Sequence, residues 1–329
     1  MRCEVLLSPS MRALCTLFCV VALGSGAVAA SAAADQRPAG GALALTAHDV
    51  DGSLLAVTSG ARWSVSGVLT HYVRGQRIAI HAFDDGRPIL SAPAALHPAG
   101  RTATFTVSLR VGGVGRVTVR AIHYATHAQA RIVSPSVSVW IVAPTIAPGQ
   151  RSLAVRILQA KLAALHYVIG AAGVFDARTQ RAVLAFRKMA GLPLTMAANA
   201  GVFAALDAGR GVFTVRYPAQ GRHVEADLTH QVLALIGADG RVESLYPMSS
   251  GKPSTPTTPG TFTVYEKQFG TNSDGMVDSS YFNGGDAIHG YYEVPPYAAS
   301  HGCLRVPIPD ALTIYDWVTL GTTVDVYFR

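Results

Sequence analysis

Cysteine is scarce in this sequence of 329 residues, and the positions of its few cysteines limit what they can do. Three of the four, Cys3, Cys15 and Cys19, lie in an N-terminal segment with the pattern of an export signal, so a processed chain would keep only Cys303. A disulfide needs two cysteines, so Cys303 cannot be a structural crosslink unless it pairs with another molecule. Nucleophilic chemistry, metal binding and simple burial remain.

Charged residues are also few, at 14% of the chain, whereas hydrophobic residues make up 50%. This balance is ordinary for a folded extracytoplasmic protein and excludes an intrinsically disordered one. No basic cluster is interleaved with aromatic residues, which argues against nucleic-acid binding. The net charge of +7 favours an anionic partner, for which export makes a cell-wall polymer the more plausible choice, and a role in solubility alone is the alternative.

Residues 1–34 predict a signal peptide. Arg2 and Arg12 precede an apolar run over residues 13–30, and Ala32-Ala33-Ala34 resembles a cleavage site. The run is nearly long enough to span a bilayer, so an uncleaved segment would be a membrane anchor, but the small residues after it favour cleavage. We therefore expect a secreted protein that works in the cell wall or the periplasm.

Residues 40–143 predict an immunoglobulin-like β-sandwich that has no disulfide. Short runs in which polar and apolar residues alternate are separated by Gly and Pro, and this period of two is typical of half-buried strands. The domain's histidines have no compact metal-ligand spacing, so we interpret them as surface or strand residues and the domain as a spacer. These histidines are His71, His81, His97, His123 and His127.

A linker rich in Pro and Gly at residues 143–149 is followed by a change from a period of two to a helical period. Ser152 can cap a first helix, and Asp176 or Thr179 can start a second. Apolar residues at helical spacing follow both positions, so residues 150–208 predict a small all-α domain of two or three short helices.

Two strings in this region, residues 155–165 and 173–187, resemble the helical peptidoglycan-binding domain found in many wall enzymes. The sequence departs from the usual pattern at His166, where Gly is common, and at Arg187, where Gln is usual. The resemblance implies glycan binding. A helical module that binds nothing is the alternative, because apolar helix spacing alone indicates only a core.

Residues 211–329 return to strand patterns and predict a mostly β domain with its chemistry on loops. Ala238-Asp239-Gly240 predicts a hairpin turn, and Asp310 lies in the first turn of a predicted short helix at residues 309–317. The predicted strands are residues 212–217, 231–236, 241–246, 260–265 and 323–328.

Cys303 lies in this domain, where two histidines could act on it. A free thiol with a pKa of about 8.5 is mostly protonated at neutral pH, so a nucleophilic cysteine needs a neighbouring base or cation. His301 is two residues away and lies on the same side of an extended segment, and His289 lies further upstream. Gly290 and Gly302 permit close backbone approach and can present amide groups to an oxyanion.

The motif Ile288-His289-Gly290, followed by Ala299-Ser-His-Gly-Cys-Leu-Arg-Val306, resembles the signature of the YkuD-type L,D-transpeptidases. These wall enzymes cross-link peptidoglycan through a catalytic cysteine. Residues 249–252 and 255–262 resemble the stretch that precedes this signature in the same family. The fixed order of several elements makes the resemblance specific, and it predicts an L,D-transpeptidase catalytic domain over residues 211–329.

The resemblance implies a role for each residue of the signature. Cys303 would be the nucleophile and His289 the general base, oriented by the main-chain carbonyl of Gly290. His301 would support the thiolate or the oxyanion, and the amides of Gly302 and Cys303 would donate hydrogen bonds to the oxyanion. No cofactor or metal is expected.

Four residues are predicted to bind substrate: Arg305, Ser300, Tyr291 and Tyr281. Arg305 stands where the family often has Asn or Arg, and we expect it to hold the loop or to meet a substrate carboxylate. The segment between His289 and Ser300 is shorter than in the long form of the signature, and its residues 291–297 are aromatic and stiff. We expect this segment to line the acyl-donor groove.

The implied activity is an acyl transfer between peptidoglycan stem peptides. The thiol attacks the third residue of a tetrapeptide stem, D-alanine leaves, and the amine of a second stem resolves the thioester. The implied partners are stem peptides and glycan, with carbapenem-type β-lactams as inhibitors. No nucleic acid is expected, and a membrane only through an uncleaved N-terminal segment.

Four alternatives remain open at the level of sequence. Water could resolve the thioester, which would make the protein an L,D-carboxypeptidase that trims stems. The protein could instead be an inactive wall-binding scaffold. His289, His301 and Cys303 could hold zinc, since three N and S ligands suffice for a catalytic site. Finally, Cys303 could be an inert buried thiol.

Overall fold

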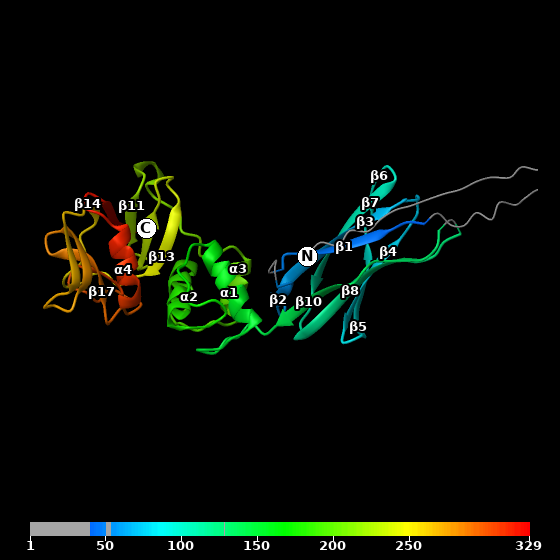
Figure 1. The fold of residues 1–329 in the computed structure, drawn as a ribbon, viewed down its shortest axis with the longest axis horizontal. Coiled ribbons are helices and arrows are strands. Elements are labelled where there is room, and N and C mark those ends of the chain that lie inside the picture. Colours follow the sequence, from blue (N-terminus) through cyan, green and yellow to red (C-terminus); the bar gives the residue numbers. More distant parts are fainter. Residues whose placement is uncertain (1–39, 51–53, 128) are drawn as a thin grey trace, which may run out of the picture. The chain divides into compact units, whose positions relative to one another are not determined.

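The computed structural model describes residues 40–50, 54–127 and 129–329, and the predicted signal peptide lies outside this range. Three groups of elements follow one another along the described chain: β-strands, then three helices, then a second set of strands with one further α-helix (Figure 1). This order confirms the predicted fold class. None of the described helices is long and apolar enough to cross a membrane.

The N-terminal strands form two sheets around one core, which confirms the predicted β-sandwich. One sheet has the order β1-β3-β7-β6 and the other β2-β10-β8-β4-β5, with β9 paired to β8. Trp63 and Phe105 from the first sheet share an apolar cluster with Ile80 and Val119 from the second. The strands are β1 (Leu43–His48), β2 (Ala56–Thr58), β3 (Arg62–Thr70), β4 (Ile78–Asp84), β5 (Arg87–Ala94), β6 (His97–Ala99), β7 (Thr102–Arg110), β8 (Gly115–His123), β9 (Ile132–Val133) and β10 (Val137–Val142).

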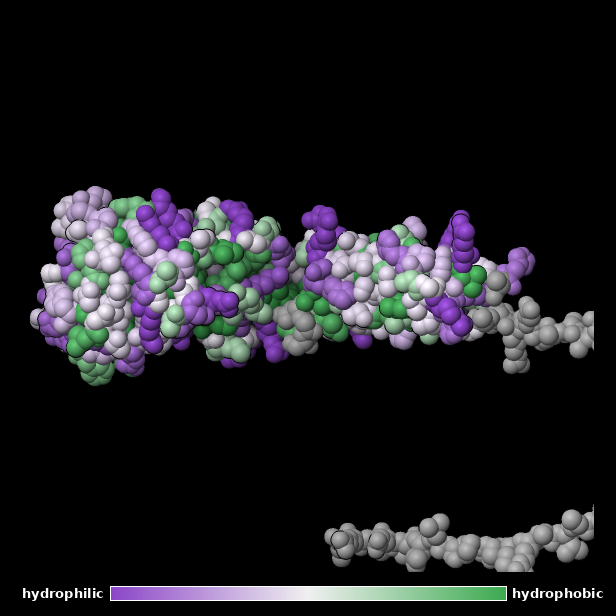
Figure 2. Space-filling view, turned by 90° about the horizontal axis from the view of Figure 1, so that it is seen from above, coloured by the Kyte–Doolittle hydropathy of each residue, from purple (hydrophilic) through white to green (hydrophobic). Residues whose placement is uncertain are grey.

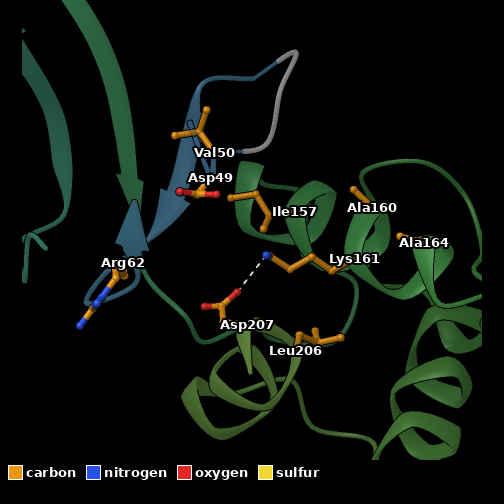
Figure 3. Close-up of a pocket in the computed structure, with 9 residues that line it drawn as sticks. All are labelled: Asp49, Val50, Arg62, Ile157, Ala160, Lys161, Ala164, Leu206 and Asp207. Carbon is orange, nitrogen blue, oxygen red and sulfur yellow. Dashed lines mark ion pairs between the residues drawn. The ribbon is translucent and has the colours of Figure 1, made fainter. Parts of the chain in front are cut away.

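The helical region consists of α1 (Leu153–Ala164), α2 (Ala177–Ala190) and α3 (Ala200–Asp207). Ser152 and Asp176 cap α1 and α2 as predicted, each accepting a hydrogen bond from an amide of the first turn, and Asn199 caps α3 in the same way. An ion pair of 2.8 Å between Lys161 of α1 and Asp207 of α3 links the first and last helices (Figure 3).

The two departures from the peptidoglycan-binding pattern have structural explanations. His166 follows α1 with a φ of 67°, the left-handed conformation that favours glycine, and its carbonyl accepts a hydrogen bond from Leu245. The buried Arg187 side chain donates to the carbonyl oxygens of Pro193 and Ala197, so it holds the loop between α2 and α3. Neither residue disturbs the helical core.

The C-terminal region contains two sheets and one α-helix that pack around a second core. The sheets have the orders β13-β12-β11-β19-β14 and β15-β16-β17-β18. The elements are η1 (Pro218–Gln220), β11 (His223–Asp227), β12 (Val232–Ile236), β13 (Val242–Pro247), β14 (Gly260–Thr263), β15 (Glu266–Thr271), β16 (Val277–Asn283), β17 (Asp286–Tyr291), β18 (Leu304–Pro307), α4 (Ile308–Trp317) and β19 (Thr323–Tyr327).

The prediction of a strand at residues 212–217 is wrong, because this segment has no regular secondary structure and leads into η1 with only a bend at Arg216. The amides of Arg216 and Tyr217 donate to the carboxylate of Glu225 on β11, at 2.8 Å each, instead of pairing with a neighbouring strand. A buried carboxylate therefore replaces a β-ladder here. The other four predicted strands and the predicted helix are present, with ends shifted by one or two residues.

The helical region packs directly on the first C-terminal sheet. Tyr167 forms a β-bridge with Leu245 of β13, and apolar residues of α1 and α2 share one buried cluster with residues of β12 and β13. A shared apolar core of this kind resists separation of the two regions. Elsewhere, the face seen in Figure 2 mixes hydrophilic and hydrophobic residues.

The cap of α2 gives a stability prediction. The Asp176 carboxylate accepts from the amides of Thr179 at 2.8 Å and Ala171 at 2.7 Å, so Asp176→Ala should lower the free energy of unfolding by about 1 kcal/mol. Asp176→Asn keeps an acceptor oxygen and should lose much less. Thermal and urea unfolding of the three proteins followed by circular dichroism measures both effects. Equal stability of Asp176→Ala and wild type would contradict the assigned cap.

Candidate active site

Parallel pairing of β17 with β18 brings the predicted catalytic residues together. The register places His289 opposite Arg305 and Ile288 opposite Leu304, so Cys303 enters the sheet beside Ala287. Side chains alternate along strands, and Ile288 and Leu304 point into the core. Cys303, Arg305 and His289 therefore share the opposite face of the sheet.

That face opens into a pocket of about 300 Å³. Of the residues predicted from sequence, the pocket is lined by Cys303, His289, His301, Arg305, Ser300 and Tyr291. Asp274 and Met276 also line it, although sequence reasoning did not single them out. Tyr281, predicted to bind substrate, is not among the lining residues, and its hydroxyl donates to Gln268 at 3.1 Å.

His289 is buried and held in one orientation. Its Nδ1 lies 2.9 Å from the carbonyl oxygen of Gly290, an acceptor, so Nδ1 carries the hydrogen and Nε2 keeps its lone pair. Burial lowers the pKa of His289 to about 4, the Gly290 contact opposes this shift, and the Arg305 charge adds to it. The imidazole is therefore neutral at physiological pH and able to accept a proton.

Cys303 is also uncharged in this arrangement. Burial raises the pKa of its thiol, and the negative charge of Asp286 raises it further, whereas the amide of Ala287, its own amide and the Arg305 charge lower it. The sulfur lies 3.7 Å from the carbonyl oxygen of Gly285, to which a protonated thiol can donate. The resting pair is thus a thiol and a neutral imidazole, in contrast to a preformed thiolate and imidazolium.

Gly302 allows the turn before Cys303 to pack against Asp286. Its φ of 132° lies in the region that favours glycine, and an added Cβ would lie 2.0 Å from Oδ1 of Asp286. Burial raises the pKa of Asp286, while a hydrogen bond from Asn283 opposes that shift. A carboxyl group therefore lies directly behind the turn that carries Cys303.

Ser300 organises the same turn from inside. The amide of Gly302 donates to Ser300 Oγ at 3.2 Å, and Ser300 Oγ donates to the carbonyl oxygen of Cys303 at 2.6 Å. The hydroxyl predicted to bind substrate is thus engaged within the loop. The Gly302 amide, predicted to donate to an oxyanion, is engaged with it as well.

The segment that precedes β14 supports the cysteine turn from the other side. Ser249 exchanges two backbone hydrogen bonds of 3.0 Å with Arg305, and Thr257 Oγ1 donates to the carbonyl of Gly302 at 2.6 Å. Lys252 Nζ lies 2.8 Å from Nε2 of His301, so an ammonium group stands at the rim of the pocket. In the sequence, Lys252 is marked only by the motif at residues 249–252.

Arg305 brings positive charge to the centre of the site. Its guanidinium lies 4.0 Å from the centroid of the Tyr291 ring, and it lowers the pKa of both His289 and Cys303. Within the described residues, no group of three or more His, Cys, Asp or Glu side chains is placed to hold a metal ion. The arrangement suits acyl transfer to a thiol with imidazole as the proton acceptor.

The titration of His289 is directly testable. Because burial lowers its pKa to about 4, its ring signals in a histidine-selective NMR titration should stay those of neutral imidazole until the pH falls toward about 4. The Nδ1-protonated tautomer should be seen above that pH. A midpoint near the ordinary histidine value would show that the ring is not buried as described.

Asp286→Asn should lower the pKa of the Cys303 thiol, because it removes a negative charge while keeping the side-chain shape. The pH at which iodoacetamide alkylation of Cys303 reaches half its maximal rate should fall relative to wild type. Asp274→Asn removes an exposed carboxylate from the pocket lining and serves as the matched control. The same shift in both variants would contradict a specific effect of Asp286.

Two family models match this chain. The L,D-transpeptidase catalytic domain family, YkuD, matches residues 221–326, and a putative peptidoglycan binding domain family matches residues 151–206. Among curated proteins, no relative matches this chain.

Several solved structures are similar to this chain. An L,D-transpeptidase from Xylanimonas cellulosilytica is 34% identical, with a TM-score of 0.52, and the match covers 56% of this chain and 98% of that one. An L,D-transpeptidase from Stackebrandtia nassauensis is 22% identical, with a TM-score of 0.36 and coverage of 56% and 95%. An L,D-transpeptidase solved in complex with imipenem is 13% identical, with a TM-score of 0.29 and coverage of 83% and 94%.

Peptidoglycan, on which the family acts, lies outside the cytoplasmic membrane. The first of these relatives is more than 30% identical and is covered almost from end to end, and the catalytic-domain match contains both His289 and Cys303. A peptidoglycan-binding domain precedes the catalytic domain. The chain therefore belongs to the L,D-transpeptidases, a family of cysteine-dependent enzymes.

Proposed function

We propose that this protein cross-links the third-position residues of peptidoglycan stem peptides through a thioester on Cys303. The observation that carries the proposal is the placement of Cys303 and a neutral, oriented His289 on one face of the β17–β18 pair, inside one pocket. Export through the N-terminal segment at residues 1–34 would bring the enzyme to its substrate.

During acylation the proton of the Cys303 thiol passes to Nε2 of His289. The sulfur attacks the carbonyl carbon of the third stem residue, the peptide bond to D-alanine breaks, and the imidazolium returns the proton to the leaving amine. Since the thiol pKa is raised and the imidazole pKa is lowered, the proton moves as the carbon–sulfur bond forms. The thioester conserves the energy of the broken amide for the second transfer.

The oxyanion of the tetrahedral intermediate accepts hydrogen bonds from the amides of Gly302 and Cys303 in this proposal. The Gly302 amide must then exchange Ser300 Oγ, its partner at 3.2 Å, for the substrate oxygen. Ser300 can stay in place during this exchange because its hydroxyl donates to the Cys303 carbonyl. The oxyanion hole is thus completed only when the substrate binds.

Positive charge around the pocket fits an anionic donor. Arg305 lies among the lining residues, and the Lys252 ammonium donates to His301 at the rim. We assign these groups to the carboxylates of the stem peptide, with His301 as the link that fixes Lys252. Tyr291 supplies an apolar wall beneath Arg305.

The amine of a second stem attacks the thioester carbonyl, expels the Cys303 thiolate and gives the cross-link. A carbapenem-type β-lactam would acylate the same thiol by ring opening. Hydrolysis of the thioester, which would make the enzyme a carboxypeptidase, and an inactive scaffold are the competing outcomes of the experiment that follows.

Mass spectrometry of muropeptides separates these outcomes. Incubation of the enzyme with disaccharide-tetrapeptides should give dimers joined through two third-position residues with release of D-alanine, and Cys303→Ala should give none. Shortened monomers alone would show that water is the acceptor. Dimer formation by Cys303→Ala would remove the assigned nucleophile.

His289→Ala should slow acylation by roughly 10²- to 10⁴-fold, because it removes the proton acceptor. His301→Ala should have a smaller effect, seen mainly in the KM for the stem, because His301 lies at the exposed rim and contacts Lys252. His97→Ala on the exposed β6 serves as a neutral control. If His301 were the base, His301→Ala would slow acylation more than His289→Ala.

A further inference from the structure

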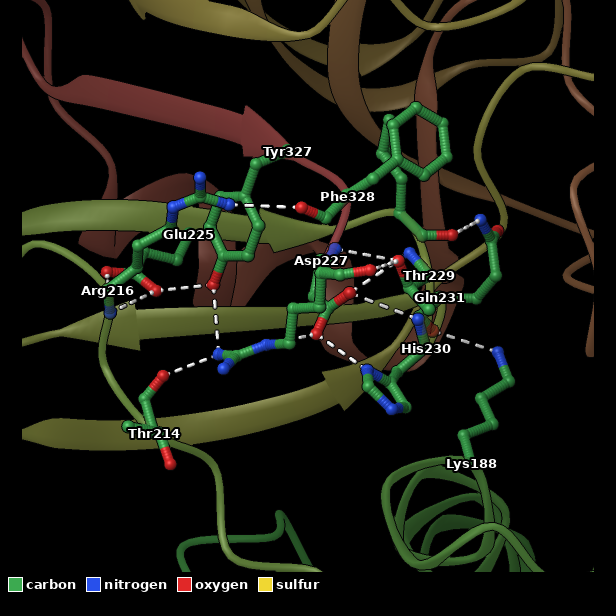
Figure 4. A network of polar contacts seen from close by, with 12 residues as sticks. Lys188, Thr214, Arg216, Glu225, Asp227, Thr229, His230, Gln231, Tyr327 and Phe328 are labelled. Atoms are coloured by element: carbon green, nitrogen blue, oxygen red, sulfur yellow. Dashed lines mark hydrogen bonds and ion pairs between the residues drawn. The ribbon is translucent and has the colours of Figure 1, made fainter.

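A lysine of the helical region reaches into the catalytic region. Lys188 lies in the last turn of α2 with its side chain almost fully buried, and its Nζ donates to the carbonyl oxygen of Gln231 at 2.9 Å (Figure 4). The same Nζ donates to the carbonyl oxygen of Met248, also at 2.9 Å. Gln231 immediately precedes β12 and Met248 immediately follows β13, two neighbouring strands of the sheet. One ammonium group therefore ties together the open ends of this strand pair.

The two tied positions lead directly to the cysteine turn. Ser250, two residues after Met248, donates its amide to Gln231 Oε1 and accepts from Gln231 Nε2 through its hydroxyl, both at 2.8 Å. The Ser250 carbonyl accepts from the amide of Ser300 at 2.9 Å. Ser300 in turn bonds the carbonyl of Cys303 and the amide of Gly302, so a continuous hydrogen-bonded path joins Lys188 to the nucleophile's turn.

A buried lysine at this point has an energetic cost that an apolar residue would avoid. Burial lowers the pKa of Lys188 to about 7, and no carboxylate forms an ion pair with it in the part of the chain that the structure describes. Charged groups removed from water destabilise a fold unless specific hydrogen bonds offset the loss. The hydrogen bonds from Lys188 to the carbonyl oxygens of Gln231 and Met248 offset this cost. A lysine at this position therefore indicates that the positions of these two residues matter.

A second contact fixes the same helix against the catalytic region. Arg178 of α2 lies 2.7 Å from the buried carboxylate of Asp310 in α4, and Arg181 lies 3.5 Å from it. Ala311, the next residue of α4, lies close to Gly290: a Cβ added to Gly290 would be 2.6 Å from the Cβ of Ala311. The helix that carries Lys188 is therefore also anchored beside the strand of His289.

We propose that Lys188 is a positioning residue for acylation, which holds Gln231 and Met248 so that Ser250 and Ser300 keep the Cys303 turn in its reactive arrangement. The helical region is then part of the catalytic apparatus in addition to any role in wall binding. The proposal rests on the proposed function where the rate of acylation by a stem peptide is measured. Alkylation of Cys303 by iodoacetamide is a second measurement, and it does not depend on the proposed function.

The test uses the full chain and a soluble tetrapeptide stem, so that wall binding cannot contribute. Lys188→Met keeps the volume but removes the donors, and it should lower the rate of acylation by roughly tenfold to a hundredfold, with a KM within about twofold of wild type. Lys188→Arg restores donors to the position and should recover most of the rate. Lys161→Met, which breaks the ion pair between α1 and α3, is the matched control and should acylate like wild type.

The pH profile of iodoacetamide alkylation separates positioning from loss of stability. In Lys188→Met its midpoint should move by about half a pH unit or more, because a displaced turn moves the sulfur relative to the Ala287 amide on β17, which lowers the pKa of the thiol. A lower melting temperature with unchanged acylation and an unchanged midpoint would overturn the proposal. If Cys303 of the wild type is alkylated normally but forms no thioester with the stem, the proposed function is wrong. The midpoints of the alkylation profiles still decide the role of Lys188 in that case.

A second variant keeps the test valid if Lys188→Met does not fold. Gln231→Met leaves Lys188 in place and removes the hydrogen bonds from the Gln231 side chain to Ser250. It should show the same fall in acylation rate and the same direction of midpoint shift. An acylation rate equal to that of wild type in Gln231→Met would show that the hydrogen-bonded path is not needed, and it would overturn the proposal.

Discussion

The parallel pairing of β17 with β18 is the constraint on which the site depends. It joins two segments that are separated by a loop, and its register decides that His289 and Cys303 face one pocket while Ile288 and Leu304 enter the core. A shift of one residue would turn the thiol and the imidazole to opposite faces. The buried apolar partners of these strands therefore secure the chemistry as well as the fold.

Burial then determines the charge state of the reacting groups. The same low-polarity surroundings lower the pKa of His289 and raise that of Cys303, so that the resting pair is neutral. Arg305 favours the thiolate, whereas Asp286 behind Gly302 opposes it. In the proposed mechanism, reactivity toward an acyl donor is thus coupled to proton transfer from Cys303 to His289.

The sequence predicted the parts of the fold that depend on local pattern. Capping residues marked the starts of α1 and α2, and alternation marked β12, β13, β14 and β19 but not β17 and β18. Residues 212–217 follow a β pattern but form no strand, and Glu225 accepts from the amides of Arg216 and Tyr217 at the end of this segment. The motif located the thiol and both histidines. The contacts of Lys252, Asp286 and Lys188 depend on tertiary packing between distant segments, for which no local pattern exists.

The most direct test of the account is intact-mass spectrometry of the enzyme after mixing with a tetrapeptide stem in the absence of an acceptor. The account predicts an adduct equal to the stem without its terminal D-alanine, located by peptide mapping on Cys303 and lost when an amine acceptor is added. No adduct, or an adduct on any other residue, would contradict the assignment of Cys303 as the thioester-forming nucleophile.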